Sequence, residues 1–181
     1  MNRRISCFLA IVLVAGCSSP SGRLARMYAS LQKDVASAGR PAGPDESLAE
    51  RHAERAAEVR EMIEKGEVTS AEDRFRAAVL LVETDDLENL HLAETLGMQA
   101  GNAGAPLGFR VAAEAIDKQA VIRHQPQRYG TQYEWVPVLR AWRLYPVDPT
   151  TTDEQRRTMG VPGLAELHEG EKRMNELLRA N

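Results

Sequence analysis

The chain has few of the residues that would point directly to a reaction. It contains two cysteines in 181 residues, 5% aromatic side chains and no large excess of one charge, with 23 basic and 26 acidic residues. It has no glycine-rich phosphate loop, no nucleophile elbow, no His-Glu-x-x-His motif and no closely spaced cysteine pair. The sequence therefore offers no complete motif for phosphate binding, for a serine hydrolase or for a zinc enzyme.

The N-terminus has the pattern of a bacterial lipoprotein signal peptide. Arg3 and Arg4 form a short basic region, and the apolar run after them is too short to span a bilayer as a helix. Leu13-Val14-Ala15-Gly16-Cys17 resembles a lipobox, in which the cysteine thiol receives a diacylglycerol and cleavage leaves the cysteine first. We predict a signal peptide over residues 1–16, lipid attachment at Cys17, and a lipidated tether over residues 17–22.

Removal of the signal peptide changes the charge and the cysteine count. It takes away two of the 23 basic residues and none of the 26 acidic ones, which leaves a net charge of −5. That charge argues against a nucleic-acid partner, for which a basic face is expected. Cys7 lies inside the signal peptide, so no disulfide is expected.

The predicted anchor also indicates a location. Two buried acyl chains of the palmitate type anchor a protein stably without crossing the bilayer. We therefore expect the membrane to be a partner through the lipid at Cys17, on the exported side of the cell membrane or the outer membrane. In lipoproteins of this kind, an aspartate directly after the lipidated cysteine favours retention in the inner membrane. This chain has Ser18 at that position, which favours the outer membrane.

The remaining chain predicts a mainly α fold. Amphipathic patterns open near Leu24, Ser47, Thr69, Asp85 and Pro106, and short loops separate them. Such helices favour antiparallel hairpins stacked as a bundle or a short solenoid, and recurrent small residues allow close approach. We expect residues 23–181 to form a single helical domain.

Several helix starts carry alternative capping residues. Thr69 or Ser70 can cap one helix, Asp85 or Asp86 the next, and Thr151 or Thr152 a short helix that ends at Gly160. The acids in these motifs are therefore interpreted as caps rather than as catalytic groups.

The character of the chain changes after Pro126. β-favouring and aromatic residues gather there and Pro137 interrupts them: Tyr133, Trp135, Val138, Trp142, Leu144 and Tyr145. We predict a small β-hairpin or extended element near residues 129–145. A last amphipathic helix follows from Leu164.

A dense run of hydrogen-bonding side chains stands between the helical and extended parts: Gln127-Arg128-Tyr129-Gly130-Thr131-Gln132. Around it lie, in order, Ala71-Glu72-Asp73, Ala112-Ala113-x-x-x-Asp117, Leu144-Tyr145-Pro146-Val147-Asp148-Pro149, Asp153-x-x-Arg156 and Met159-Gly160-Val161-Pro162-Gly163-Leu164-Ala165-Glu166. With these residues the segment from about Gly66 to Leu167 resembles a widespread bacterial family, a domain of unknown function with a Gln-x-Tyr/Phe-Gly-Thr-Gln signature. The family has no known activity, so the resemblance does not predict one.

This chain also departs from the family pattern. Members commonly carry Gln-His-Gly where this chain has Val82-Glu83-Thr84, a second histidine at Glu94, and an Asp-Arg pair at Asp117-Lys118. If the family uses those histidines as ligands or proton-transfer groups, this member is altered or inactive. If the histidines only pack, nothing is lost.

The strongest local candidate for a site is the end of the fifth helix together with the signature. Asp117 and His124 lie on one face if the helix reaches His124, and a carboxylate could then orient the imidazole as a general base requires. Pro126 disfavours helix just before it. In the alternative, Asp117 caps loop amides or forms a buried salt bridge while His124 is exposed. The candidate pocket or structural junction comprises Asp117, His124, Gln127, Tyr129, Gly130, Thr131 and Gln132.

Metal binding has weak support. His91 and Glu94 could supply two ligands, but a third is missing, so we interpret them as a surface pair and expect neither a metal nor a cofactor.

Together these patterns favour a lipid-anchored binding or interaction module of the cell envelope, without enzymatic activity and with an envelope protein as its partner. The alternative is an envelope hydrolase or a small-molecule binding protein that uses Asp117, Tyr129, Thr131 and Gln132.

Overall fold

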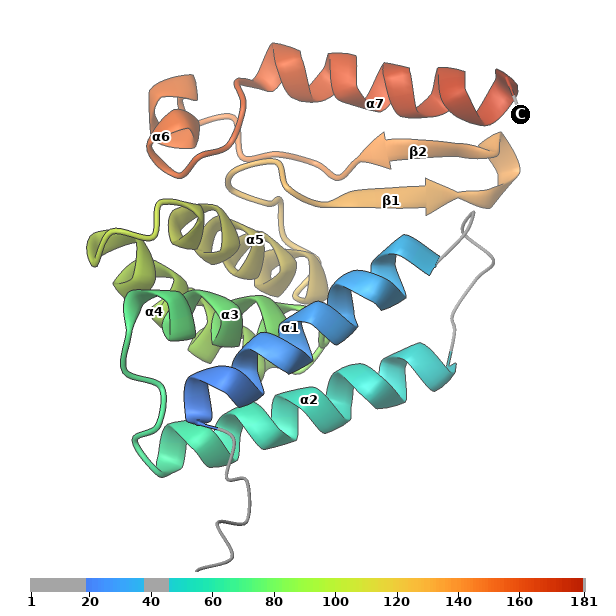
Figure 1. Ribbon diagram of the computed structural model, residues 1–181. Coiled ribbons are helices and arrows are strands. Elements are labelled where there is room, and N and C mark those ends of the chain that lie inside the picture. The colour runs from blue at the N-terminus through green and yellow to red at the C-terminus, as the bar shows by residue number, and fades with distance from the viewer. Residues whose placement is uncertain (1–18, 38–45, 181) are drawn as a thin grey trace, which may run out of the picture.

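Five helices that reverse direction from one to the next form the larger part of the protein (Figure 1). The computed structural model describes residues 19–37 and 46–180, so Cys17 and the predicted signal peptide lie outside the described residues. The helices are α1 (Pro20–Ser37), α2 (Glu46–Glu64), α3 (Ala71–Val82), α4 (Leu87–Asn102) and α5 (Leu107–Ile122).

Helix α3 lies at the centre of this part and contacts the four other helices. Most of its apolar side chains are buried and Phe75 and Val79 are partly buried, as expected for a helix surrounded by others. The core around it takes one or more residues from every helix: Leu24, Leu31, Ala56, Val59, Met62, Ala77, Ala78, Leu80, Leu81, Val82, Leu90, Ala93, Leu96, Val111 and Ala115.

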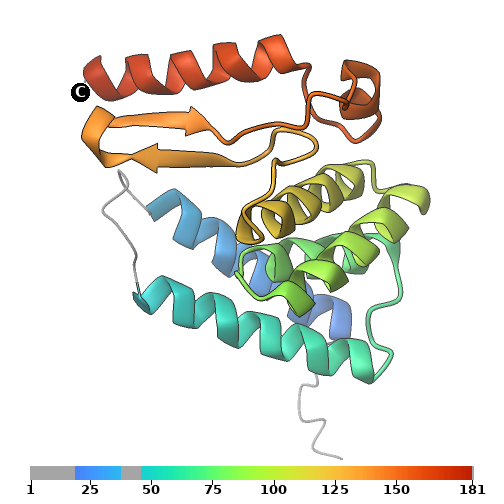
Figure 2. The same ribbon diagram turned by 180° about the vertical axis from the view of Figure 1, so that it is seen from behind.

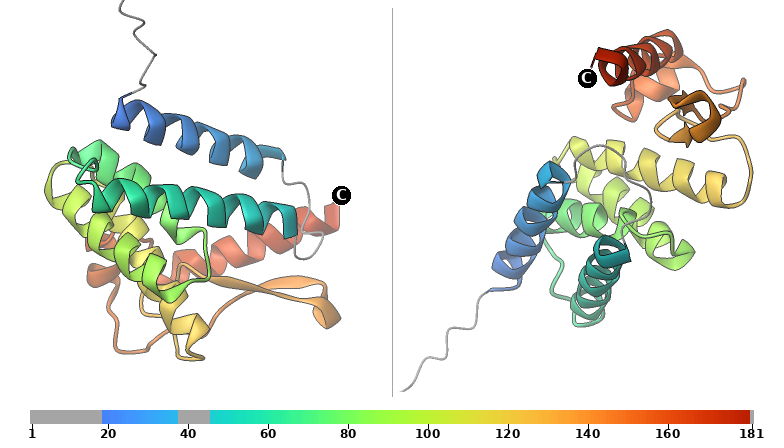
Figure 3. Two further views of the ribbon diagram at one scale, coloured as in Figure 1. Left: turned by 90° about the horizontal axis from the view of Figure 1, so that it is seen from below. Right: turned by 90° about the vertical axis from the view of Figure 1, so that its right-hand side faces the viewer.

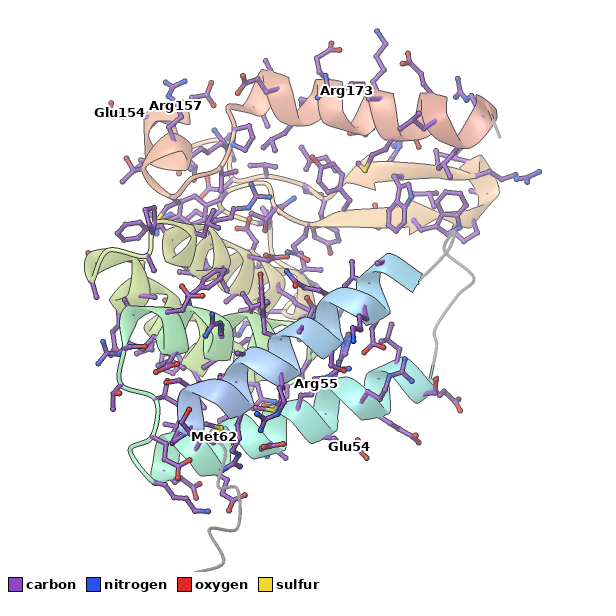
Figure 4. All side chains as sticks on the ribbon, viewed as in Figure 1. Glu54, Arg55, Met62, Glu154, Arg157 and Arg173 are labelled. Carbon is purple, nitrogen blue, oxygen red and sulfur yellow. The ribbon has the colours of Figure 1, made fainter. Side chains whose placement is uncertain are left out.

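Helices α1 and α2 pack through a mixed apolar and ionic face. In Figure 4, Met62 and Arg55 lie on the side of α2 that faces α1, whereas Glu54 lies on the opposite side. Arg55 is buried and donates to Asp34 and to the hydroxyl of Ser30 on α1. The ion pair therefore gives the two helices a fixed register beside their apolar contacts.

Glycines let α4 and α5 approach closely. A Cβ atom at Gly97 would lie 2.7 Å from the carbonyl oxygen of Gly108, and one at Gly108 would lie 2.5 Å from that of Gly97. Close-packed interiors do not accommodate such overlaps. The small residues that recur in the sequence thus bring these two backbones together.

The C-terminal part consists of a hairpin and two helices that lie against α5 (Figure 2). Strands β1 (Tyr133–Val136) and β2 (Ala141–Leu144) pair antiparallel, with a short 3₁₀ turn over Pro137–Leu139 between them. Helices α6 (Asp153–Thr158) and α7 (Leu164–Ala180) follow. The prediction of a mainly α protein with a small β-hairpin near residues 129–145 is confirmed.

Helix α5 belongs to two cores at once. Val111 and Ala115 contribute to the core around α3, whereas Ala112 and Ala113 pack in a second cluster with residues of the C-terminal part. The other buried members of that second cluster are Tyr129, Met159, Val161 and Leu167. The helical part and the hairpin part are therefore joined through the far side of α5.

The structure selects between the alternative caps. Ser70, Asp86 and Thr152 accept from the backbone N–H three residues on, and Thr152 forms a full capping box with Gln155. Helix α1 begins at Pro20, so the prediction that residues 20–22 belong to the tether is wrong: proline is favoured in a first helical turn. Among the described helices, none has the length and apolar character needed to cross a membrane.

Candidate functional site

The carboxylate of Asp117 is the centre of the signature loop, which we define as residues 127–132. One oxygen accepts from the backbone N–H groups of Arg128 and Tyr129 at 2.7 and 2.8 Å. The other accepts from the N–H groups of Gly130 and Thr131 and from the Thr131 hydroxyl, each at 2.9 Å. Asp117 is 0% exposed. Five donors thus surround one buried anion, and the loop is wrapped around it like a backbone nest.

Gln127 fastens the same loop to the exit of the hairpin. Its side-chain amide donates to the carbonyls of Gln132 and Tyr145 at 2.9 and 2.8 Å, and its side-chain oxygen accepts from the Gln132 N–H at 2.7 Å. Its backbone pairs with Pro146 and Asp148. The side chain is fully buried, and these bonds satisfy it.

Arg156 of α6 holds the loop from the opposite side. Its guanidinium is 2% exposed and donates to the carbonyl of Tyr129 at 3.1 Å and to that of Thr151 at 2.8 Å. It also pairs with Asp153, whose pKa is lowered first by the backbone N–H of Leu164 and then by Arg156. Arg156 therefore connects the signature loop to the start of α7.

Gly130 has a backbone conformation that suits glycine. Its φ angle is +96°, and a Cβ there would lie 2.5 Å from Cδ1 of Leu167. Both features exclude a side chain at this position, so the turn depends on glycine.

His124 does not join Asp117, because α5 ends first. Gln125 donates its N–H to the carbonyl of Ala120, and His124 donates to that of Val121, which closes the helix in a Schellman pattern. His124 takes the left-handed position with a φ of 56° and is exposed. The pairing of His124 with Asp117 as a base is therefore wrong, and the alternative in which Asp117 caps loop amides is the observed one.

The positions that depart from the family pattern lie outside the signature loop. Glu83 follows α3 and its carboxylate lies 4.0 Å from Nδ1 of His52. Glu94 accepts from the side chain of Gln119 at 3.0 Å, and Lys118 donates to the Val82 carbonyl at 3.1 Å. These bonds hold α3, α4 and α5 together.

The neighbouring acids influence Glu114 of α5. Burial raises the pKa of the Glu114 carboxyl, and the charge of Glu83 raises it further. His91 is exposed on α4 and lies 3.9 Å from Glu94, a surface pair. Within residues 19–37 and 46–180, no group of three His, Cys, Asp or Glu side chains is placed to hold a metal ion.

The hairpin has one closed edge and one open edge. Asn175 of α7 accepts from the Trp142 N–H at 2.7 Å and donates to its carbonyl at 2.8 Å, and Glu171 accepts from the Leu144 N–H. The pairing register directs the backbone groups of Tyr133 and Trp135 away from β2, where no described residue binds them. Among the described residues, the backbone groups on the β1 edge therefore have no partner, which is the arrangement that allows a further strand to pair.

The turn of the hairpin is also the most apolar exposed point of the described surface. Val138 is 88% exposed, and Leu139 beside it is exposed as well. Trp135 and Trp142 pack edge to face behind the turn, with ring centroids 5.6 Å apart. In Figure 1, Figure 2 and the left view of Figure 3, the turn and the N-terminal end of α1 lie at opposite ends of the protein.

Comparison with protein-family models, with curated proteins and with solved structures finds no match for this chain.

The sequence interpretation missed two groups that define this region. Arg156 was noted only as part of the family pattern, although its contact with Tyr129 spans 27 residues. Asn175 and Glu171 have the positions of surface residues in an amphipathic helix. In the structure, however, their side chains bind the outer backbone groups of β2. No local signal marks such contacts, because their partners lie far away in the chain.

Proposed function

We propose that this protein is a lipid-anchored interaction module of the cell envelope, related to the Gln-x-Tyr-Gly-Thr-Gln family, and that it acts by binding a protein partner rather than by catalysis. The observation that carries the proposal is the commitment of the signature to internal bonds: both oxygens of Asp117 are occupied by the loop that surrounds them. The most distinctive polar cluster then serves as a junction between two parts of the fold.

The start of α1 supports a defined orientation on the membrane. Only Ser18 and Ser19 separate Cys17 from Pro20, the first residue of α1. Three residue steps reach about 11 Å at most, whatever their conformation. A lipid on Cys17 would therefore hold the N-terminal end of α1 close to the membrane surface, together with Asp73 of α3, which accepts from Ser21.

The hairpin then becomes the end directed away from the membrane. It presents Val138 and Leu139 at its turn, and the open backbone groups of Tyr133 and Trp135 along β1. Exposed apolar residues and an unpaired strand edge are features of surfaces that bind other proteins. An extended segment of an envelope protein fits this surface, because it can pair with the β1 edge.

The alternative function, an envelope hydrolase or a small-molecule binding protein with a site at Asp117, requires a different state of the loop. Asp117 and Gln127 are both fully buried, so residues 127–132 would have to leave the carboxylate before a substrate could reach it. That opening would break five hydrogen bonds to one anion. The closed loop favours the interaction module.

Anchoring is tested with Cys17→Ser, followed by separation of membrane and soluble fractions. We expect the wild-type chain in the membrane fraction, labelled by an alkyne analogue of palmitate, and the variant released and unlabelled. Continued membrane association of the variant without label would refute the lipid anchor.

Partner binding is tested with a photo-cross-linking amino acid at position 138, and at position 54 on the outer side of α2 as a control. We expect a discrete adduct in cells from position 138 and none from position 54. We also expect the adduct to be lost when Tyr133 and Trp135 are replaced by proline, which removes their backbone N–H groups, or when Leu139→Ser is added. The same adducts from both positions would count against the hairpin as the binding surface.

A further inference from the structure

The turn between α4 and α5 is an uncharged and exposed point of the helical part. We define the α4–α5 tip as residues 102–107, which have the sequence Asn-Ala-Gly-Ala-Pro-Leu and carry no charge. The turns that join α2 to α3 and α3 to α4 both contain charged residues, as expected in a chain with 27% charged residues. Leu107, the first residue of α5, is 65% exposed. The tip therefore presents an apolar side chain to the solvent without a charged residue in the same turn.

The turn itself requires only part of this composition. Gly104 has a φ angle of +98°, in the region that favours glycine, and Pro106 directly precedes the first turn of α5. Leu107 has no comparable role, because it belongs to neither of the two core clusters. A single exposed leucine is common on protein surfaces, so the surroundings of Leu107 decide what it does.

A groove of about 390 Å³ extends this apolar surface from the tip to the start of α3. Ala71 and Phe75 of α3 line it on one side, and residues 104–107 of the tip line it on the other. Its one charged residue, Glu72, pairs with Arg76 at 3.0 Å. The tip and the groove thus form a continuous surface that is mainly apolar.

The start of α3 connects this surface to the start of α1. Asp73 accepts from the Ser21 hydroxyl at 2.8 Å, and the rings of Phe75 and Tyr28 lie 6.0 Å apart. In Figure 1 and in the left view of Figure 3, the tip and the N-terminal end of α1 lie at the same end of the protein. Cys17 precedes α1 by three residue steps, or about 11 Å at most. A bilayer that holds a lipid on Cys17 therefore lies beside the α4–α5 tip.

We propose that the α4–α5 tip enters the membrane interface and places Leu107 among the lipids, as a second membrane contact beside the lipid on Cys17. This contact depends on the proposed anchor, which brings the bilayer within reach and makes the insertion an intramolecular step. Burial of Leu107 is favourable because its side chain leaves water, and no charge of the tip has to be desolvated. Two contacts restrict the rotation of the protein on the membrane and keep the hairpin directed outward.

A fluorescent label on the tip tests this contact. Ala103→Cys supplies one free thiol at an exposed position, because Cys7 lies in the predicted signal peptide and Cys17 carries the predicted lipid. The mature full chain is labelled with nitrobenzoxadiazole and reconstituted in vesicles that contain nitroxide-labelled phospholipid. Val138→Cys, on the hairpin turn, carries the control label. We expect emission from position 103 to be quenched at least about threefold more strongly than emission from position 138.

Two matched substitutions assign the quenching to Leu107. Leu107→Glu and Leu177→Glu make the same change at side chains that are both 65% exposed, one on the tip and one near the C-terminal end of α7. A charge resists transfer into the membrane, so Leu107→Glu is expected to lower the quenching at position 103 to that at position 138. Leu177→Glu is expected to leave it unchanged, and equal effects of the two substitutions would overturn the proposal. A glutamate in the first turn of α5 suits the helix dipole, and thermal unfolding checks that each variant is folded.

The anchor and the tip contact are tested separately. Labelling with the alkyne analogue of palmitate reports the anchor alone. If the chain carries the lipid and position 103 is quenched no more than position 138, the anchor stands and the tip contact is refuted.

If the chain carries no lipid, the two labels are compared in a Cys17→Ser chain that a histidine tag before residue 17 holds on vesicles with nickel-chelating lipid. Stronger quenching at position 103 supports the tip contact there, and equal quenching refutes it. In either form, emission that shifts to shorter wavelength without quenching shows that a protein surface covers the tip, which contradicts the proposal.

Discussion

Substitution Asp117→Asn replaces one carboxylate oxygen by an amide group while the shape of the side chain stays the same. The remaining oxygen can serve either Arg128 and Tyr129 or Gly130 and Thr131, but not both pairs. The new NH₂ group then faces two backbone N–H groups, and it cannot accept a hydrogen bond from either of them. Each lost bond to a charged acceptor is worth about 1.5–3 kcal/mol, so we expect a loss of about 3–6 kcal/mol of unfolding free energy.

Urea unfolding followed by two probes measures this loss. Trp135 and Trp142 both lie in the hairpin, and their fluorescence reports the C-terminal part, whereas far-UV circular dichroism reports mainly the helices. Domains are commonly stable by about 5–15 kcal/mol, so the variant is expected to unfold at a much lower urea concentration. A fluorescence transition that precedes the circular dichroism transition would show that the junction opens first.

Two further variants calibrate the result. Thr131→Val removes the one hydroxyl donor and leaves the four backbone donors, so we expect a loss of about 0.5–1.5 kcal/mol. Glu169→Gln makes the same chemical change on the exposed face of α7 and is expected to stay within about 0.5 kcal/mol of wild type. If Asp117→Asn is as stable as Glu169→Gln, the role of Asp117 as the centre of the junction is refuted. If Asp117→Asn stays folded and loses a cellular function, the alternative of a site at Asp117 gains support.

Two other variants test the helical packing and its charge. Gly108→Ala places a Cβ against the backbone of α4, so we expect urea unfolding to show a loss of about 1–3 kcal/mol of unfolding free energy. Gly170→Ala is the control, because its Cβ would meet nothing closer than 3.9 Å, and it should be neutral or stabilising. Because burial raises the pKa of Glu114 above its ordinary value of 4.5, wild-type stability is fully present below that value and falls as the pH rises through the raised pKa. Glu114→Gln should therefore raise the melting temperature at pH 8 and have little effect at pH 4, and an equal effect at both pH values would contradict this account.

The helices and the hairpin follow from local features of the sequence. Ser70, Asp86 and Thr152 cap the helices that their spacing indicates, since a cap requires only a side chain and an N–H three residues later. Pro137 and the aromatic residues around it form the predicted pair of strands. The structure also brings the candidate residues around Asp117 together, whereas His124 lies apart from them.

The open question of where α5 ends has a local cause as well. Helix α5 ends with a left-handed residue, the position that glycine usually occupies, and here a histidine fills it. Without a glycine the sequence shows no clear stop before Pro126, so the helix could be drawn two residues too long. Only the backbone path shows that His124 turns away.

The sequence by itself determined the class of fold, the helix starts, the hairpin, and the prediction of a lipid at Cys17, because each depends on residues within one or two turns of each other. The tertiary structure alone decided what the signature loop does. Asp117 meets donors 11 to 14 residues away, and Arg156 reaches Tyr129 across 27 residues. Such partners are set by the path of the whole chain, and no periodicity or cap encodes them.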